Sequence, residues 1–377
     1  AVKGCREGLS QARRIVVKVG TSTITYPNGQ LNLNRLEKLA RELSDLKNSG
    51  HQVILVSSGA VGAGMARLGY SQRPKDVAEK QALAAVGQGI LLRIYERLFD
   101  EYGQTVAQVL LTKENSVHHN LYVNSRRTLG RLLELGIVPI INENDAVSAD
   151  ELKIGDNDNL SAMVATLVEA ELLIILSDID GLYTADPASD PAATLISRVE
   201  EITPDIERIA GSAGSSLGTG GMMTKIDAAK IAMSAGVAMV IARGEIDGIL
   251  HSVVEGAEVG TLFAPKEARL KLRKRWIAFG RRLDGVITVD DGCAEALRVK
   301  GKSLLAAGIK SVGGCFETGA TVRIIDLLGR EIARGIVRYD SETIQSIAGL
   351  STKEIAARIP SSDGQPVVHR DDMVIIA

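Results

Sequence analysis

Short runs of apolar, mostly β-branched residues alternate with amphipathic helical segments through the first two-thirds of the chain. This alternation constrains the fold more strongly than any other feature. The short runs are apolar throughout, so both faces of each strand are expected to be buried. Strands of this kind form mainly parallel sheets that helices cover on both sides. The pattern therefore predicts an α/β fold in which helices sandwich a mainly parallel sheet.

The predicted strands and helices alternate along the first domain. Strands are predicted at residues 15–19, 53–56, 106–111, 137–141, 172–176 and 237–241. Helices are predicted at residues 34–50, 76–102, 122–135, 160–169 and 222–235. Asn34 is predicted to cap the first helix, because an asparagine side chain accepts hydrogen bonds from the first turn.

The pattern changes near residue 265. Residues 266–282 are dense in charge and are interpreted as a linker. Short strands and glycine turns follow, which indicates a compact β-rich domain. The prediction is an α/β domain over residues 1–265, a linker over 266–282 and a β-rich domain over 283–377. Within that last domain, strands are predicted at 285–289, 321–325, 332–339 and 374–376, and short helices at 341–348 and 352–358.

Composition excludes several classes of protein. The 377 residues include 44 Lys and Arg against 46 Asp and Glu, a balance that argues against a dedicated DNA-binding protein. The three cysteines, Cys5, Cys293 and Cys315, are far apart, so they support neither a disulfide framework nor a zinc site. No apolar stretch is long enough to cross a bilayer. We expect a cytoplasmic protein with no membrane partner.

Polar, glycine-rich segments follow the predicted strands at the edge where ligands bind in α/β sheets. The first strand runs into 18–22, which holds a lysine, a glycine and two hydroxyls, and the second runs into 57–64. Glycines there let backbone N–H groups approach an anion. Each segment alone is more often a tight turn than a phosphate site.

A third polar cluster is more informative. Residues 142–145 and 155–160 bring four acidic groups and several amides together within a short stretch. One interpretation is an Asx-rich loop in which Asp158 or Asn159 caps the next helix. A cap explains only one of these residues, so the other interpretation is a polar pocket that holds a charged small molecule and orients basic groups.

Two further segments complete the pattern. Residues 176–187 follow the fifth strand, and the glycine- and hydroxyl-rich residues 211–225 lead to Lys225. On composition alone, a mobile surface linker is the slightly favoured interpretation of the second segment. Lys18, Lys225, the glycine-rich strand ends and the acidic cluster together match the needs of phosphoryl transfer, which requires cations and backbone donors around the phosphates.

At this level of detail the sequence resembles the glutamate 5-kinases of the amino acid kinase family, over nearly the whole chain. The resemblance in the first domain is carried by VVKVGTS (16–22), SSGAVGAG (57–64), INENDAV (141–147), KIGDNDNLSA (153–162), LSDIDGLYTADP (176–187) and GTGGMMTK (218–225). The second domain resembles a PUA domain in KSLLAAGIKSVGG (302–314), RGIVRYDS (334–341) and VVHRDDMV (367–374).

The resemblance implies ATP-dependent phosphorylation of the γ-carboxylate of L-glutamate to L-glutamyl 5-phosphate, the first step of proline biosynthesis. It implies ATP and Mg²⁺ as cofactors, proline as a feedback inhibitor and a homo-oligomer. A glutamate carboxylate, with a pKa near 4.3, is already ionised at neutral pH, so the reaction needs no general base. RNA binding by the PUA-like domain stays open.

The resemblance also assigns roles to individual residues. Lys18, Lys225 and Asp158 would be catalytic: the two lysines would lie near the phosphates and Asp158 would orient them. Ser58, Asp145 and Asn157 would bind glutamate. Lys18 and Lys225 would also bind ATP, and no metal ligand is assigned. The remaining residues implied to bind ATP are Ser177, Asp178, Thr219, Gly220, Gly221, Met222, Met223 and Thr224.

Two alternatives remain open from the sequence. The first is another activity of the same superfamily, with acetylglutamate, aspartate or carbamate as the phosphate acceptor. The second is an RNA-binding protein, for which the low aromatic content (3%) and the balanced charge are unfavourable.

Overall fold

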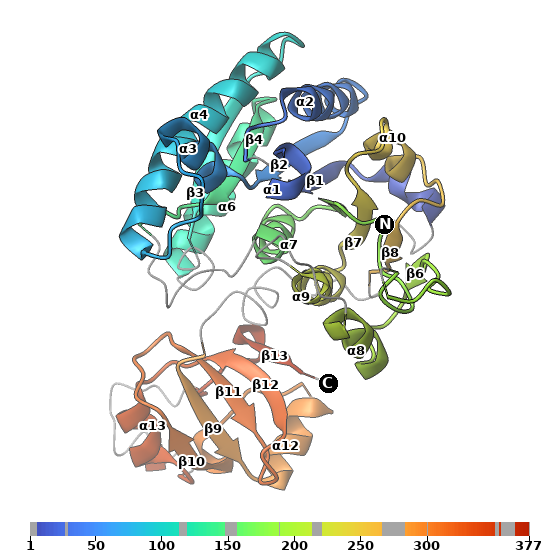
Figure 1. Ribbon diagram of the computed structural model, residues 1–377. Helices are drawn as coiled ribbons and strands as arrows, with labels where there is room; N and C mark the ends of the chain where they lie inside the picture. The colour runs from blue at the N-terminus through green and yellow to red at the C-terminus, as the bar shows by residue number, and fades with distance from the viewer. Residues whose placement is uncertain are drawn as a thin grey trace. The chain divides into compact units, whose positions relative to one another are not determined.

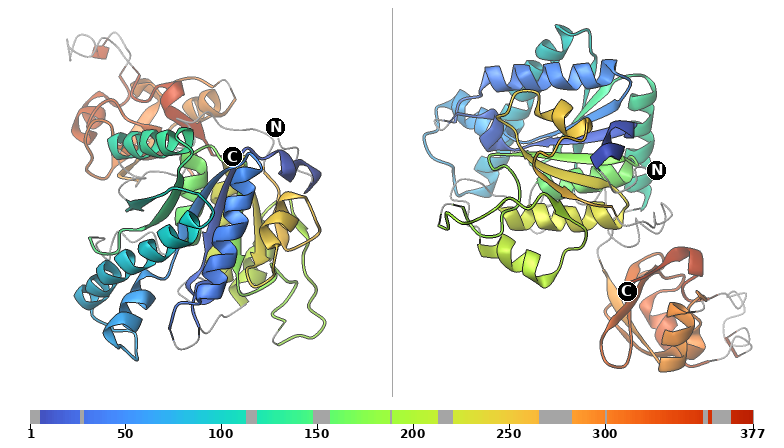
Figure 2. Two further views of the ribbon diagram at one scale, coloured as in Figure 1. Left: turned by 90° about the horizontal axis from the view of Figure 1, so that it is seen from above. Right: turned by 90° about the vertical axis from the view of Figure 1, so that its right-hand side faces the viewer.

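The chain divides into two compact units, Ala1–Arg269 (unit 1) and Leu270–Ala377 (unit 2), which are shown in Figures 1 and 2. The predicted linker, residues 266–282, lies outside the described part of the chain. The computed structural model describes residues 6–26, 29–112, 119–147, 157–187, 189–212, 221–265, 283–299, 301–350, 354–355 and 366–376.

Unit 1 is built on an eight-stranded sheet with the order β3-β4-β2-β1-β5-β7-β8-β6. The first six of these strands pair in parallel, which confirms the predicted mainly parallel sheet. β8 pairs antiparallel with β7, and β6 pairs in parallel with β8. The bounds are β1 Arg14–Val19, β2 Gln52–Ser57, β3 Val106–Leu111, β4 Val138–Glu143, β5 Leu172–Ser177, β6 Arg198–Val199, β7 Ala238–Arg243 and β8 Thr261–Phe263.

Alternate residues of the central strands enter cores on opposite faces of this sheet, because strand side chains alternate in direction. Ile15, Val17 and Val19 of β1 pack in one core with the buried side of α2 (Leu33–Asn48), and α4 (Val77–Asp100) joins them. The predicted sandwich is confirmed, because α7 (Asn157–Leu167) contacts the central strands and α9 (Met222–Ser234) packs against α7 and β7, on the side of the sheet away from α2 (Figure 1).

The predicted N-cap of α2 was wrong by two residues. The side chain of Asn32 accepts a hydrogen bond from the backbone N–H of Arg35 at 3.2 Å, whereas Asn34 lies inside the first helical turn. Both positions carry asparagine, and the sequence alone does not choose between them. The choice follows from the backbone N–H of Asn32, which donates to the carbonyl of Ile24 and so fixes where the chain enters the helix.

Shorter elements of unit 1 connect the strands. Glycine matters most where α3 and α4 cross: a Cβ at Gly64 would lie 2.0 Å from the carbonyl oxygen of Leu83, and one at Gly87 would lie 1.7 Å from that of Ala60. α6 matches a predicted helix, but α8, α10, β6 and β8 were not predicted. The bounds are η1 Arg6–Gln11, α1 Thr21–Ile24, α3 Ala60–Leu68, α6 His119–Glu134, α8 Pro204–Ser212 and α10 Ile249–Val254.

Unit 2 contains a separate five-stranded sheet with the order β10-β9-β11-β12-β13 and its own core, which includes Ile287, Val322 and Ile324. β10 and α12 were not predicted, and most of the predicted helix at 352–358 lies outside the described residues. No helix in the described part of the chain is long and apolar enough to cross a membrane. The bounds are β9 Gly285–Val289, α12 Asp291–Arg298, η3 Ala306–Gly308, β10 Ile309–Gly313, β11 Thr321–Ile325, β12 Glu331–Ile336, α13 Ser341–Ile347, η5 Arg370–Asp372 and β13 Met373–Ile375.

Candidate active site

The candidate site lies at the carboxyl ends of the central strands of unit 1. β2, β1 and β5 are neighbours in the sheet and run parallel, so their carboxyl ends share one edge. β2, β3 and β4 lie on one side of β1, and the strands from β5 onward lie on its other side. Ligands in open α/β sheets bind where the strand order reverses in this way. Lys18, Ser57 and Ser177 lie at these three strand ends.

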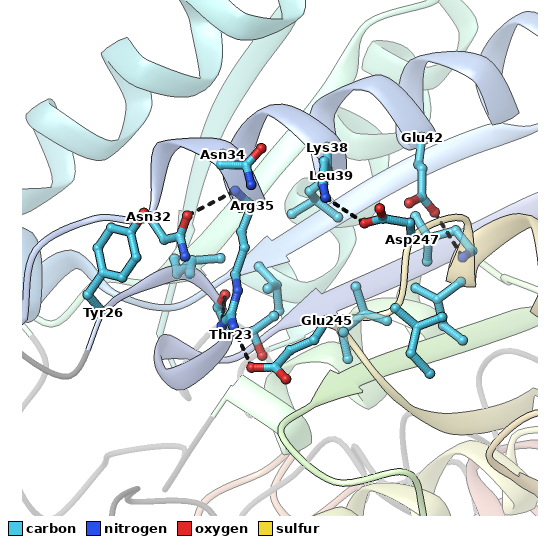
Figure 3. A pocket seen from close by; sticks show the side chains of 17 residues that line it. Thr23, Tyr26, Asn32, Asn34, Arg35, Lys38, Leu39, Glu42, Glu245 and Asp247 are labelled. Atoms are coloured by element: carbon cyan, nitrogen blue, oxygen red, sulfur yellow. Dashed lines mark hydrogen bonds and ion pairs between the residues drawn. The ribbon is translucent and has the colours of Figure 1, made fainter.

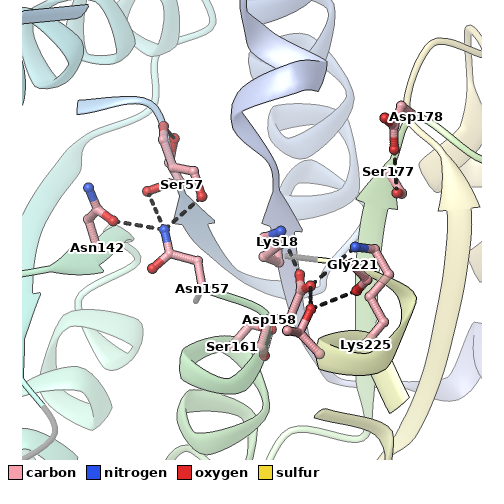
Figure 4. A network of polar contacts seen from close by, with 12 residues as sticks. Lys18, Ser57, Asn142, Asn157, Asp158, Ser161, Ser177, Asp178, Gly221 and Lys225 are labelled. Atoms are coloured by element: carbon pink, nitrogen blue, oxygen red, sulfur yellow. Dashed lines mark hydrogen bonds and ion pairs between the residues drawn. The ribbon is translucent and has the colours of Figure 1, made fainter. Parts of the chain in front are cut away.

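Two lysines meet on one buried carboxylate at this edge (Figure 4). Asp158 lies in the first turn of α7 and is fully buried. Its Oδ1 lies 2.5 Å from Nζ of Lys18, which comes from β1, and its Oδ2 lies 3.2 Å from Nζ of Lys225, which comes from α9. Three separate elements therefore converge on a single side chain, and both of its oxygens are engaged.

Asp158 is the second residue of α7, so it lies inside the helix rather than at the cap position before it. Its carboxylate contacts lysines from β1 and α9. Burial by itself raises the pKa of the Asp158 carboxyl, but the ammonium groups of Lys18 and Lys225 outweigh burial and hold the pKa below its ordinary value. Asp158 is therefore ionised at neutral pH and holds two positive charges together.

Thr224, near the start of α9, places its hydroxyl beside the same carboxylate. Oγ1 of Thr224 lies 3.0 Å from Oδ2 of Asp158 and 2.8 Å from the carbonyl oxygen of Gly221, which precedes the helix. Met222 is buried and Met223 is exposed, so the two methionines point different ways. Thr219 and Gly220, which were also predicted to belong to the site, lie outside the described residues.

A second polar network surrounds Asn157, the residue before Asp158. Its Nδ2 lies 2.8 Å from Oγ of Ser58 and 2.9 Å from Oδ1 of Asn142, and it also approaches the carbonyl oxygen of Ser57 at 3.3 Å. These contacts join the start of α7 to the ends of β2 and β4. Two of the predicted substrate-binding residues, Ser58 and Asn157, are thus directly bonded.

The other predicted residues lie near the same edge. Oγ of Ser177, at the end of β5, donates to Oδ1 of the exposed Asp178 at 3.0 Å. Asp145 lies half-buried, two residues after β4 ends. Its strand end is the one that also carries Asn142.

Tyr95, on α4, contacts a residue of the strand edge that holds the site, and sequence analysis did not identify it. The hydroxyl of Tyr95, on α4, lies 2.8 Å from Oγ of Ser57, and both side chains are buried. Burial raises the pKa of Tyr95, so its hydroxyl keeps its proton. Tyr95 belongs to an ordinary apolar helical face, and no motif distinguishes it from its neighbours.

The described residues contain no group of three or more His, Cys, Asp or Glu residues arranged to hold a metal ion. Asp158 is the buried carboxylate at the centre of the site, and both of its oxygens already face ammonium groups. The donor set therefore suits an anionic ligand bound by lysines rather than a cation bound by carboxylates.

Fold and site define an α/β protein in which one buried carboxylate holds two lysines at the edge of a mainly parallel sheet. The chain belongs to the amino acid kinase family, whose model matches residues 13–243, and the model of the PUA domain matches residues 285–359.

Relatives with established names lie within the same family. The chain is 51% identical over 372 residues to glutamate 5-kinase from Moorella thermoacetica, covering 99% of this chain and 98% of the relative. It is 50% identical over 363 residues to glutamate 5-kinase from Caldanaerobacter subterraneus, covering 96% and 98%. Glutamate 5-kinase from Nostoc punctiforme is 49% identical over 365 residues, covering 97% and 100%.

Proposed function

We propose that this chain catalyses the ATP-dependent phosphorylation of the γ-carboxylate of L-glutamate, giving L-glutamyl 5-phosphate and ADP. The observation that carries the proposal is the convergence of Lys18 and Lys225 on the buried carboxylate of Asp158. The choice of L-glutamate as the substrate rests on relatives named glutamate 5-kinase that match nearly the whole chain. The product is the first intermediate of proline biosynthesis.

In the proposed reaction, a glutamate γ-carboxylate oxygen forms a bond to the γ-phosphorus of ATP. The bond between that phosphorus and the oxygen bridging to the β-phosphate breaks, and ADP leaves with the electron pair. The carboxylate nucleophile is ionised at neutral pH, so no residue has to remove a proton. Lys18 and Lys225 neutralise the charge on the transferring group, because fixed cations are the main catalytic device in phosphoryl transfer.

Asp158 is proposed to orient the two lysines. Without a carboxylate between them, two ammonium groups this close would repel each other and turn away. Ser58, Asn157 and Asp145 are proposed to bind glutamate. Ser177, Asp178 and the segment Thr219–Lys225 are proposed to bind ATP.

Mg²⁺ is proposed to arrive bound to ATP rather than to a protein site. The described carboxylates do not gather into a metal cluster, and Mg²⁺ commonly keeps water and substrate phosphates as ligands. The protein residues proposed here act on the phosphates and on glutamate directly.

Other properties of the chain are proposed on family resemblance alone. They are feedback inhibition by proline, a homo-oligomeric state and a cytoplasmic location. The proposed domain limits are 1–265 for the kinase domain, 266–282 for the linker and 283–377 for the PUA-like domain. RNA binding by the PUA-like domain is not part of this proposal; filter binding to structured RNA across a salt series would test it.

The direct test of the reaction uses hydroxylamine. Purified protein is mixed with ATP, Mg²⁺, L-glutamate and hydroxylamine, and γ-glutamyl hydroxamate is measured. Hydroxylamine traps an acyl phosphate, so a hydroxamate that requires both ATP and glutamate is the expected result. ADP formation with aspartate, acetylglutamate or carbamate, and none with glutamate, would keep the phosphotransferase and overturn the substrate.

A further inference from the structure

Arg35 connects three segments of unit 1 that are far apart in the sequence (Figure 3). It lies in the first turn of α2. Its Nη1 lies 3.2 Å from the carbonyl oxygen of Thr23 and 3.4 Å from that of Ser22. Its Nη2 forms an ion pair with the carboxylate of Glu245, in the loop that follows β7. One planar guanidinium group therefore bonds α1 and this loop to α2.

The segment that Arg35 holds has few bonds of its own. α1 spans only Thr21–Ile24, and such a short helix leaves most of its backbone groups without partners inside the helix. Its backbone bonds include Thr23 N–H to Gly20 at 3.2 Å and Thr25 N–H to Thr21 at 3.0 Å. The hydroxyl of Thr23 is buried and has no hydrogen-bond partner among the described residues. The position of α1 therefore depends on contacts from outside it.

The loop after β7 touches α1 from a second direction. A Cβ at Gly244 would lie 2.7 Å from Cγ2 of Thr23 and 3.1 Å from Cβ of Leu176. The backbone N–H of Gly244 donates to the carbonyl oxygen of Ser177 at 2.8 Å. The loop that Glu245 ties to Arg35 is thus also bonded to the end of β5, where the candidate site lies.

Arg35 itself lies on the other face of the sheet from the candidate site. Val19 and Leu176 line a cavity of about 320 Å³ together with Arg35 and Thr23. Lys18 precedes Val19 in β1, and Ser177 follows Leu176 in β5. Successive strand residues point to opposite faces of a sheet, so Lys18 and Ser177 point to the face that holds the candidate site. The link between the two faces is short: a Cβ at Gly20, directly before α1, would lie 3.5 Å from Nζ of Lys18.

We propose that Arg35 is a positioning residue for phosphoryl transfer. It fixes α1, and through Gly20 it fixes the space beside the ammonium group of Lys18, without touching the substrates. This inference rests on the proposed function for its kinetic test. Small displacements of groups around a reacting phosphoryl group are costly, so loosening α1 lowers the turnover number.

The kinetic test compares Arg35→Ala with Lys38→Ala. Lys38 lies on the same helix and pairs with Asp247 of the same loop at 2.7 Å, with a side chain 33% exposed against 29% for Arg35. Among the described residues, it makes no hydrogen bond to α1. We expect Arg35→Ala to lower kcat about tenfold or more, with both KM values changed less than about twofold, and Lys38→Ala to keep the wild-type kcat.

Chemical rescue adds a readout that loss of stability does not produce. Guanidinium ion, below denaturing concentrations, restores part of the kcat of Arg35→Ala by occupying the vacated position, and it does not raise the kcat of Lys38→Ala. Equal losses of kcat in the two variants, or a normal kcat in Arg35→Ala, would overturn the proposal.

A measurement that needs no activity separates this proposal from the proposed function. Amide hydrogen exchange is followed in a peptide that spans Gly20–Thr25. We expect exchange to be about tenfold faster in Arg35→Ala than in wild type and unchanged in Lys38→Ala, because lost contacts lower the cost of local opening. Unchanged exchange in Arg35→Ala overturns the positioning role. A wild-type protein without glutamate-dependent turnover overturns the proposed function and leaves the exchange result to decide the role of Arg35.

Discussion

At the scale of single residues, the site depends on charges that are buried together. Lys18, Lys225 and Asp158 are each less than one-tenth exposed. Ion pairs in water contribute little, but a buried pair loses several kcal/mol when one partner is removed. The three residues therefore have separable effects: removing a lysine leaves the carboxylate with the other lysine, whereas removing the carboxylate takes a buried negative charge from both ammonium groups.

Replacing Lys225 tests its role in turnover. We expect Lys225→Met to lower kcat about 100-fold or more, as removal of a single transition-state donor does. Stability should change little, because Met keeps most of the aliphatic stem and Asp158 retains Lys18. Lys230→Met is the matched control, since Lys230 lies on the same helix and pairs with Glu207 at 2.8 Å, but is 40% exposed. Steady-state kinetics measure kcat; similar losses in the two variants would remove Lys225 from the mechanism.

Replacing Asp158 tests its ionisation through stability. Asp158→Asn should lower the free energy of unfolding by about 3–5 kcal/mol at pH 5, because the negative charge shared by two buried ammonium groups is lost. A lowered carboxyl pKa contributes stability that is present above the ordinary pKa of 3.8 and disappears as pH falls through the folded-state value. The difference between wild type and variant should therefore persist down to about pH 4 and shrink below it.

Urea unfolding at pH 6, 5, 4 and 3 measures this difference. A difference that already shrinks between pH 6 and pH 5 would mean that the pKa of Asp158 is raised, and that the lysines do not dominate its environment.

At the scale of elements, the crossing of α3 and α4 lies directly after the end of β2. The two helices approach so closely that a Cβ at Gly87 would lie within 1.7 Å of the backbone of Ala60, the first residue of α3. Ala60 follows Ser58 by two residues. We therefore expect an increase in the helix separation to displace the predicted glutamate-binding residue Ser58.

Alanine substitutions at two glycines of α4 separate packing from helix propensity. Gly87→Ala should lower the free energy of unfolding by about 1–3 kcal/mol through overpacking and raise the KM for glutamate. Gly89→Ala, with no atom within 4 Å of the added Cβ, should raise the free energy of unfolding by about 0.5–1 kcal/mol. Urea unfolding and glutamate titrations measure both effects. A KM for glutamate that is normal in Gly87→Ala would show that α3 does not position Ser58.

The strands with almost continuous burial, β1, β2, β4, β5 and β7, were all predicted to within two residues of their observed bounds, because each carries an apolar run. Residues 106–111, 285–289 and 321–325 were predicted with the bounds that the structure gives them, although each strand also contains partly buried or exposed residues. β10 was missed because its sequence, IKSVG, shows neither an apolar run nor an alternation.

The candidate site was also predictable only in part. The motifs around Lys18, Asp158 and Lys225 can each be recognised in the local sequence, and the resemblance to a known family indicated that they form one site. Partners such as Arg35 and Glu245, 210 positions apart, carry no local signal, and the fold alone brings them together.

At the scale of the whole molecule, every described residue of the candidate site belongs to unit 1, and each unit has its own hydrophobic core. Chains with separate cores commonly unfold in more than one step. The clearest test uses the same substitution in each core. Ile174 in β5 and Ile324 in β11 are both fully buried, so replacing either with alanine should cost about 2–5 kcal/mol locally.

Differential scanning calorimetry of the full chain should resolve two transitions. Ile174→Ala should lower the midpoint of one and Ile324→Ala the midpoint of the other, because each substitution opens a cavity in a different core. Glutamate-dependent ATP turnover, measured after heating to a temperature between the two midpoints, should follow the transition that Ile174→Ala shifts. If both substitutions shift a single transition, the units unfold together and the core of unit 2 contributes to the stability of the catalytic unit. If turnover instead follows the transition shifted by Ile324→Ala, unit 2 is required for activity, although none of the described site residues lies in it.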